Sequence, residues 1–191
     1  RFASALNEDL IKPETEFIDL PKSIRCGKNR IGEYDNKIPS DLTAEQIIIR
    51  SGNIGSVRIG QKIGSEKYKS FLEKIGVLSP IDFDINEVAP QKDYNFGKCK
   101  LATASYGHGI ATTILQLAKG YAILSNGGYD VKPTLILKDN KNYRGVRLLN
   151  RGVSDQVVTV LRKIVNTEEG TAKFADVPNY EIGGKTGTAD K

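Results

Sequence analysis

A glycine-rich stretch near the end of this 191-residue chain, Gly183-Gly184-Lys185-Thr186-Gly187-Thr188-Ala189, limits most strongly what the chain can fold into. It directly follows Tyr180-Glu181-Ile182, a run that can enter a strand. Side chains on a strand alternate between its two faces, so Thr186 and Thr188 project to one side and Lys185 to the other. Glycines at alternate positions let a backbone or a ligand lie close against the strand. The stretch therefore predicts a strand that presents an ammonium and hydroxyls to an anionic ligand.

Two other interpretations of this stretch remain open. Gly184-Lys185-Thr186 could end a phosphate-binding P-loop, but that loop needs a glycine five positions before Gly184, where this chain has Asn179. The stretch is also compatible with an exposed glycine-rich hairpin that carries a solvated lysine, because short motifs often match by chance.

Composition favours one domain without a nucleic-acid partner. With 39% hydrophobic residues, the chain can bury one sizeable core. The net charge of +5 comes from 28 basic and 23 acidic residues dispersed along the chain, without a basic tract interleaved with aromatic residues. No apolar run approaches the roughly 20 residues that span a bilayer, and no signal peptide is recognisable. Methionine is absent, even at position 1, which indicates part of a longer protein or a processed form.

The two cysteines, Cys26 and Cys99, are too few to form a zinc site alone. They can pair only if the fold brings these distant positions together. We therefore expect free thiols.

Hydrophobic periodicity and capping residues predict several helices. The expected helices cover residues 2–9, 44–50, 54–63, 66–75, 114–125 and 155–165. Their expected N-caps, where the sequence offers one, are Ser40 or Asp41, Ser65, Thr113 and Ser154. Thr113 gives the clearest signal, because Gln116 completes a capping box three positions later and Asn126-Gly127-Gly128 ends the helix. Gly60 is expected to let another helix approach closely.

Three of these helices have a stripe of residues that we expect to be buried. The predicted buried residues are Phe71, Leu72 and Ile75; Ile114, Leu117, Ala118, Tyr121 and Ala122; and Val157, Leu161 and Ile164. The helical lobe is expected at about residues 40–128 and 153–170. Sheet-forming segments are expected at about residues 131–138, interrupted by Pro133, and 180–189. Residues 11–42, which contain three prolines, suit an extended connection with short strand pairs.

Ser51-Gly52-Asn53 lies in a turn between two of the predicted helices. A hydroxyl and a carboxamide two positions apart are common in turns, where both side chains bond the local backbone. A turn between helix ends also exposes both side chains, so that Ser51 could pass a proton and Asn53 could hold a peptide bond. A plain turn and a catalytic turn both remain possible.

These segments resemble, in their order along the chain, the transpeptidase domain of penicillin-binding proteins. The matching segments are Ser51-Gly52-Asn53, Tyr106-Gly107-His108-Gly109-Ile110 leading into Leu115-Gln116-Leu117-Ala118, Asn126-Gly127-Gly128, and Lys185-Thr186-Gly187-Thr188. Within the family, the chain is most similar to the class B, division-specific (septal) enzymes. It departs at His108, where relatives usually have an aromatic residue whose place the imidazole can fill, and at Ile114, where a proline usually follows the capping threonine.

The resemblance implies an α+β fold of the penicillin-recognising, β-lactamase-like kind, with residues 1–191 as a single domain that is incomplete at both ends. The family nucleophile is a serine three residues before a lysine, and no serine of this chain has a lysine at that offset. Residues 2–6 resemble the continuation of the nucleophile's helix, so we expect that motif before residue 1. We expect this chain alone to be inactive.

The resemblance also implies a D,D-transpeptidase that cross-links peptidoglycan stem peptides ending in D-Ala-D-Ala through a serine acyl-enzyme, and that binds β-lactam antibiotics. Ser51 would relay a proton, Asn53 would hold the substrate amide, and Lys185 would supply positive potential for the substrate carboxylate. Thr186-Gly187-Thr188 would bind the substrate, with the backbone N–H of Thr188 as one half of the oxyanion hole.

The family reaction needs no cofactor or metal. Other cell-division proteins are expected partners, at the periplasmic face of the inner membrane, with an N-terminal anchor outside this chain. Two alternatives remain: a D,D-carboxypeptidase, in which water instead of an amine takes the acyl group, and a non-catalytic scaffold that lost the nucleophile.

Overall fold

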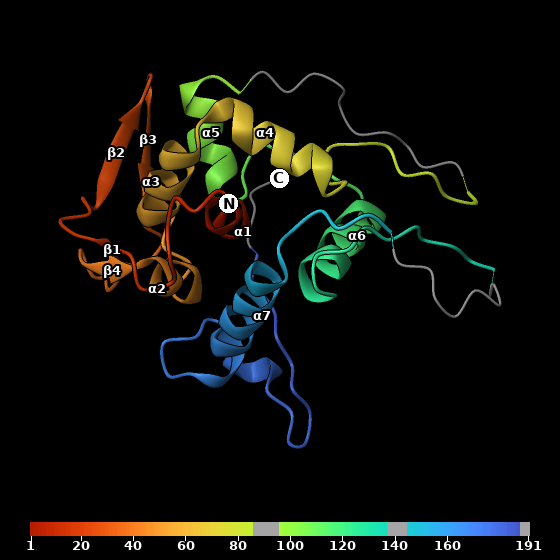
Figure 1. Ribbon diagram of the computed structural model, residues 1–191. Coiled ribbons are helices and arrows are strands. Elements are labelled where there is room, and N and C mark those ends of the chain that lie inside the picture. Colours follow the sequence, from red (N-terminus) through yellow and green to blue (C-terminus); the bar gives the residue numbers. More distant parts are fainter. Residues whose placement is uncertain (86–95, 137–144, 188–191) are drawn as a thin grey trace.

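The computed structural model describes residues 1–85, 96–136 and 145–187, which form a helix-rich α+β fold with two small antiparallel sheets (Figure 1). The helices are α1 (Phe2–Asn7), α2 (Ala44–Ile49), α3 (Asn53–Ile63), α4 (Ser65–Lys74), α5 (Lys98–Ser105), α6 (Ile114–Ser125) and α7 (Arg151–Asn166), with a short 3-10 helix η1 (Lys173–Ala175). The strands are β1 (Glu16–Phe17), β2 (Ser23–Cys26), β3 (Asn29–Gly32) and β4 (Leu42–Thr43). All six helices predicted from the sequence are present within a few residues of their expected bounds.

Helix α3 lies at the centre of the larger helical group and contacts α1, α2, α4 and α5. Its Ile54 and Ile59 are fully buried. A Cβ atom added at Gly60 would lie only 1.8 Å from the Oγ of Ser105 on α5, so the two helices meet at this glycine. The prediction that Gly60 admits another helix is confirmed. The predicted burial of Phe71 and Leu72 on α4, and of Ile75 directly after it, is confirmed as well.

The two sheets lie beside this helical group (Figure 1). Strand β1 pairs with β4, and β2 pairs with β3 in a hairpin whose register places Ser23 opposite Gly32 and Cys26 opposite Asn29. The expectation of free thiols is wrong, because Cys26 at the tip of this hairpin forms a disulfide with Cys99 on α5. Their Cα atoms are 5.5 Å apart, a separation that a disulfide bridges readily.

Three of the predicted N-caps are wrong. Helix α2 is capped by Thr43, whose hydroxyl accepts the Gln46 N–H while the Gln46 side chain accepts the Thr43 N–H, so neither Ser40 nor Asp41 is the cap. Gly64 precedes α4, and Ser65 is the first residue of that helix.

Ser154 lies inside α7 instead of capping it. Its buried hydroxyl donates to the Leu124 carbonyl at 2.7 Å and accepts the Gly127 N–H at 3.0 Å. It therefore ties the end of α6 to α7, and the residue at the N-cap position of α7 is Asn150.

Helix α6 has the predicted Thr113–Gln116 capping box, but the side predicted to be buried is largely exposed. Ile114 is 90% exposed and Leu117 is 48% exposed. The buried positions are Gln116, Gly120 and Ile123. The Gln116 amide donates to the Ser79 carbonyl at 2.7 Å, so a satisfied polar side chain faces inward where the hydrophobic pattern places Leu117.

The two segments predicted to form sheet are irregular in the part of the chain that the structure describes. Residues 131–136 contain no strand; an isolated bridge joins Tyr129 to Arg147 nearby. Residues 180–187 run without strand pairing along α7. A strand needs a hydrogen-bonded neighbour, and neither segment has a ladder partner among the described residues. Residues 137 and 138, and 188 and 189, lie outside them.

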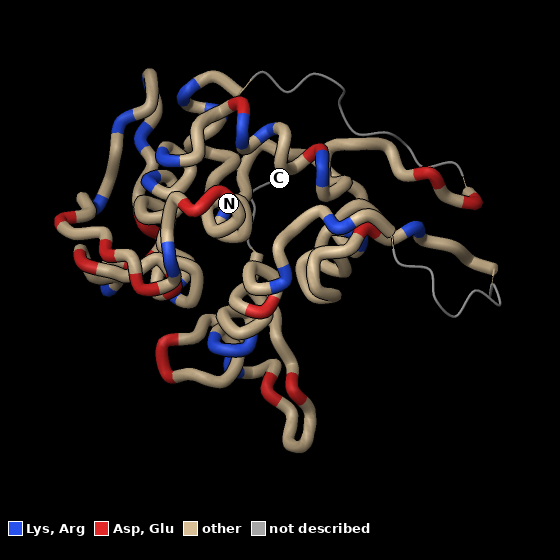
Figure 2. The backbone as a smooth tube through the Cα atoms, in the orientation of Figure 1, with Lys and Arg blue, Asp and Glu red and all other residues tan. Residues whose placement is uncertain are grey.

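Helix α7 packs against α1, α2 and α6. Its predicted buried residues Val157 and Ile164 are buried, whereas Leu161 is only half-buried. Charged residues of both signs are interspersed along the backbone (Figure 2). Among the described residues, no helix is both long and apolar enough to cross a membrane.

Candidate active site

The turn Ser51-Gly52-Asn53 joins α2 to α3. Helix α2 ends at Ile49, and the Gly52 N–H donates back to the Ile47 carbonyl at 2.9 Å, which closes the turn. Ser51 has a φ of 58°, a left-handed conformation that is uncommon for residues other than glycine. Asn53 begins α3, so a tight turn holds the serine between two helix ends.

A neighbouring loop makes hydrogen bonds to both sides of this turn. The Tyr34 hydroxyl donates to the Arg50 carbonyl at 2.9 Å, on the α2 side. On the α3 side, Glu33 accepts the backbone N–H of Asn53, and the Asn53 side chain donates through Nδ2 to the Gly32 carbonyl at 2.9 Å. No local motif in the sequence marks Glu33 or Tyr34 as part of the site.

The segment that contains Lys185 lies along α7. The Gly184 N–H donates to the Leu161 carbonyl at 3.1 Å, and the Arg162 guanidinium donates to the Ile182 carbonyl at 2.9 Å. Gly183 lies close to the helix backbone, where an added Cβ would be 3.2 Å from the Arg162 nitrogen. Glycine at this position therefore lets the segment lie against α7.

The fold brings the Ser51-Gly52-Asn53 turn and the segment that contains Lys185 together. Lys185 Nζ donates to Ser51 Oγ at 2.8 Å, although the two residues are 134 positions apart in the sequence. The same ammonium also donates to the Thr186 carbonyl at 2.9 Å and to Thr186 Oγ1 at 3.1 Å. Thr186 Oγ1 lies 3.0 Å from Thr171 Oγ1, a contact that the sequence did not predict. The hydroxyls of Ser51 and Thr186 thus share one cation.

Burial, together with the smaller effect of the positive charge of Arg1, lowers the pKa of Lys185 from its ordinary value of 10.5 to about 8. The ammonium is therefore still mainly charged at neutral pH, but it gives up its proton far more readily than a solvated lysine. An anion placed beside it would restore the proton, because an opposite charge favours the charged form. This arrangement suits binding of a carboxylate.

The other predicted site residues lie as follows. Gly187 is exposed beyond Lys185, and Thr188 lies outside the described residues. The His108 ring packs against Tyr106 with ring centroids 4.9 Å apart, as a ring in an aromatic's place would. No group of three or more metal-ligating side chains is found in the described ranges.

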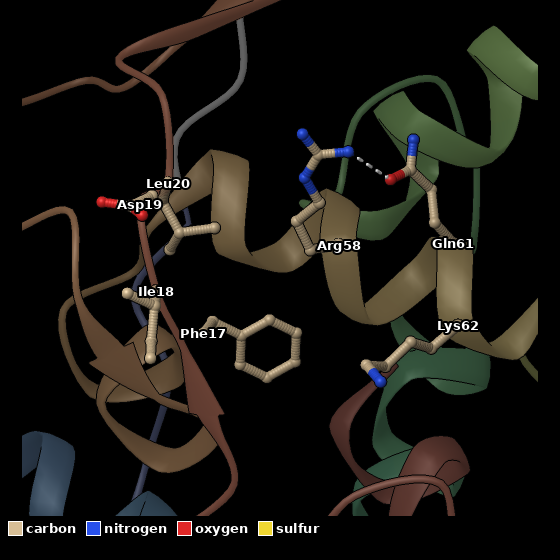
Figure 3. Close-up of a pocket in the computed structure, with 7 residues that line it drawn as sticks. All are labelled: Phe17, Ile18, Asp19, Leu20, Arg58, Gln61 and Lys62. Atoms are coloured by element: carbon tan, nitrogen blue, oxygen red, sulfur yellow. Dashed lines mark hydrogen bonds between the residues drawn. The ribbon is translucent and has the colours of Figure 1, made fainter.

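A pocket of about 400 Å³ lies elsewhere, between the chain after β1 and the C-terminal half of α3 (Figure 3). It is lined by Phe17, Ile18, Asp19, Leu20, Arg58, Gln61 and Lys62. Arg58 donates to the Gln61 side chain at 3.0 Å, and no predicted site residue lines this pocket. The pairing of Ser51 with Lys185 is therefore a separate feature of the molecule.

Residues 2–191 match the model of the penicillin-binding protein transpeptidase domain. The chain belongs to this family. A peptidoglycan D,D-transpeptidase FtsI homolog from Mesostigma viride is 29% identical over 198 residues, and a probable peptidoglycan D,D-transpeptidase FtsI from Caulobacter vibrioides is 28% identical over 177 residues. These alignments cover 89% and 91% of this chain but only 31% and 30% of the two relatives.

Two solved structures share this fold. The apo transpeptidase domain of penicillin-binding protein 3 from Burkholderia pseudomallei matches with a TM-score of 0.86 at 26% identity, over 100% of this chain and 58% of that one. A peptidoglycan glycosyltransferase from Burkholderia ambifaria matches with a TM-score of 0.90 at 25% identity, over 100% of this chain and 60% of that one. The predicted α+β fold and the resemblance to the division-specific members are confirmed.

Proposed function

We propose that residues 1–191 form one incomplete domain of a peptidoglycan D,D-transpeptidase that cross-links stem peptides through a serine acyl-enzyme and that β-lactams acylate. The observation that supports this most strongly is the 2.8 Å hydrogen bond from Lys185 to Ser51, which joins two motifs of the family in one place. An exposed hairpin lysine would not meet the hydroxyl of a strained turn. Family membership supplies the reaction class.

In this proposal the Lys185 ammonium attracts the terminal carboxylate of the D-Ala-D-Ala stem or the carboxylate of a penicillin. Thr186 adds a hydroxyl donor to the same anion, in the manner of charge-assisted hydrogen bonds. Ser51, already bonded to Lys185, relays the proton between the family's active-site lysine and the leaving amine. Gly187 and Thr188 continue the substrate-binding segment, with the Thr188 N–H stabilising the oxyanion.

Asn53 would hold the substrate's amide. Its Nδ2 already donates to the Gly32 carbonyl, which fixes the orientation of the carboxamide. The opposite atom, Oδ1, is then the group that would accept the N–H of the substrate peptide bond. The same hydrogen bond that orients the side chain thus selects which end of the substrate amide it would contact.

The proposal includes the setting of the reaction. Division-specific enzymes of this family act outside the cytoplasm, so we propose a site at the periplasmic face of the inner membrane, an anchor before residue 1, and cell-division proteins as partners. The similarity to FtsI homologues supports this assignment.

Fluorescent penicillin provides the test. The full-length gene product should form a covalent adduct that survives on a denaturing gel and that excess unlabelled β-lactam prevents, whereas residues 1–191 alone should give none, because no serine here stands three positions before a lysine. An unlabelled full-length protein would favour the scaffold alternative. A stable adduct on the isolated chain would refute the assignment of the nucleophile to another segment.

The carboxypeptidase alternative needs a second measurement. A stem-peptide mimic ending in D-Ala-D-Ala should release D-alanine and form a new amide when an amine acceptor is supplied. Release without any amide product would favour the carboxypeptidase.

A further inference from the structure

Glu33 makes two hydrogen bonds that fix the start of α3. Its Oε2 accepts the backbone N–H of Asn53 at 2.7 Å, and its Oε1 accepts that of Ile54 at 3.0 Å. The first amides of a helix have no partner within it, and a carboxylate there is also favoured by the helix dipole. Glu33, which comes from a hairpin 20 positions earlier, therefore caps the 11-residue helix α3 from outside.

This cap begins at Asn53, two residues after the strained Ser51. Ser51 is held at a φ of 58°, which persists only where the surroundings fix both flanks. Tyr34 holds the preceding flank through the Arg50 carbonyl, and Glu33 holds the following flank through the Asn53 amide. Glu33 lies directly against the turn, because a Cβ atom added at Gly52 would be in ordinary van der Waals contact with Glu33 Oε1 at 3.7 Å.

The loop that carries Glu33 is itself anchored. It continues directly from β3, which pairs with β2, and the tip of that hairpin is covalently joined to α5 by Cys26 and Cys99. The carbonyl of Gly32, the last residue of β3, accepts a hydrogen bond from the Asn53 side chain. The hairpin therefore connects the helical core to the Ser51 turn, and Glu33 is the charged residue that contacts the turn.

We propose that Glu33 is a positioning residue for the acylation reaction, acting through its two hydrogen bonds to hold Ser51 and Asn53 in line with Lys185. This inference rests on the function proposed above. Small displacements matter at such a site, because a misplacement of about 1 Å can slow a reaction roughly a hundredfold. Removal of the carboxylate should therefore affect the rate far more than the fold.

The test compares Glu33→Ala, Glu33→Gln and a matched control in the full-length gene product. Glu45→Ala is the control, because it also removes a half-buried carboxylate from a hydrogen bond, the 2.7 Å contact with Lys163, but one that lies away from the turn. We expect acylation by fluorescent penicillin to be slower by about tenfold or more in Glu33→Ala. Glu33→Gln, which keeps one acceptor, should fall between wild type and Ala, and Glu45→Ala should keep the wild-type rate.

A double-mutant cycle separates positioning from general damage. If Glu33 acts through the turn, adding Glu33→Ala to Ser51→Ala should slow acylation far less than it does in the wild type. A wild-type rate in Glu33→Ala, or an undiminished effect in the Ser51→Ala background, would overturn the inference while leaving the proposed function intact. A wild type that is not acylated would remove the proposed function, and with it this role for Glu33.

Amide hydrogen exchange supplies a direct measurement of this cap in the full-length gene product. Glu33→Ala, which removes both acceptors, should speed exchange at Asn53 and Ile54 while leaving the amides in the middle of α3 protected, because only the first turn loses its partners. Unchanged exchange at both amides would show that Glu33 does not hold the start of the helix, and the inference would fail.

Discussion

Replacement of Lys185 by alanine separates a catalytic cation from a solvated one. Lys185 Nζ contacts Ser51 Oγ at 2.8 Å and Thr186 Oγ1 at 3.1 Å. In the proposed function this ammonium also holds the carboxylate of the substrate or drug, and a hydrogen bond to a charged group contributes about 1.5–3 kcal/mol. At about 1.4 kcal/mol per factor of ten, Lys185→Ala should slow acylation by roughly ten- to a hundredfold.

The same change should have little effect on stability at neutral pH. Burial holds the pKa of Lys185 at about 8, below its ordinary value of 10.5, so the folded state disfavours the charged form. Between these two pH values the unfolded chain binds more protons than the folded one, and the free energy of unfolding rises with pH through that window. Lys185→Ala should abolish this rise. Near neutral pH it should not lower the melting temperature, because it removes a charge that the folded state disfavours.

The pH dependence of acylation gives the sharpest assay. Because the charged form attracts the carboxylate, the second-order rate in the full-length protein should fall as the pH rises through about 8. Lys185→Arg keeps the charge at every accessible pH but not the compact ammonium, so it should recover part of the rate and lose the inflection. A thermal melt of each variant is the control. Equal rates in wild type, Ala and Arg would refute the reasoning, as would an inflection that survives in Lys185→Arg.

Two further predictions concern the core. Replacing Cys26 and Cys99 by serine removes a covalent link between residues 73 positions apart, which should lower the free energy of unfolding by about 4 kcal/mol in the chain-entropy model. The midpoint of unfolding in denaturant should fall accordingly. The wild type under reducing conditions should unfold at the same midpoint as the variant. Gly60→Ala should destabilise the fold by about 1–3 kcal/mol, because its Cβ would meet Ser105 on α5. Gly152→Ala, where nothing lies within 4 Å of the added Cβ, is the matched control and should be neutral or stabilising; similar melting temperatures for both alanine variants would contradict the packing argument.

Local signals in the sequence were reliable where the physics is local. The capping box of Thr113 and Gln116 depends only on residues within one helical turn, and it is present. The close approach of α5 to α3 at Gly60 depends on one missing side chain, and it is present as well. The motif order likewise sufficed to predict the family and the fold. Ser51 and Lys185 were predicted as separate motifs, and their contact depends on tertiary packing.

The errors arose where a long-range partner decides. The pairing of Cys26 with Cys99 needs the β2–β3 hairpin to reach α5, which neither cysteine's neighbours in the sequence can indicate. Gln116 is polar, so the helical pattern predicts that it is exposed. It is buried because its side-chain amide donates a hydrogen bond to the carbonyl of Ser79, 37 positions earlier. Glu33 has no motif at all, because its role consists of contacts 20 and 21 positions along the chain.

The relative placement of Ser51 and Lys185 follows from the packing of α2 on α7. Ser51 comes two residues after the end of α2. Lys185 directly follows Gly184, whose N–H donates to the Leu161 carbonyl of α7. Two ion pairs span these regions, Lys163 with Glu45 at 2.7 Å and Arg50 with Glu169 at 3.0 Å, but their side chains are still partly exposed to water, and surface pairs contribute only about 0–1 kcal/mol each.

Burial of apolar side chains such as Ile47 and Ile164 therefore fixes the distance between the two helices more than charge does. A site whose cation and hydroxyl are each only one or two residues from a packed helix needs little further ordering when a substrate binds. The least constrained part of the site is the strained backbone of Ser51. Glu33 and Tyr34, which follow the hairpin, make hydrogen bonds to the residues on either side of it.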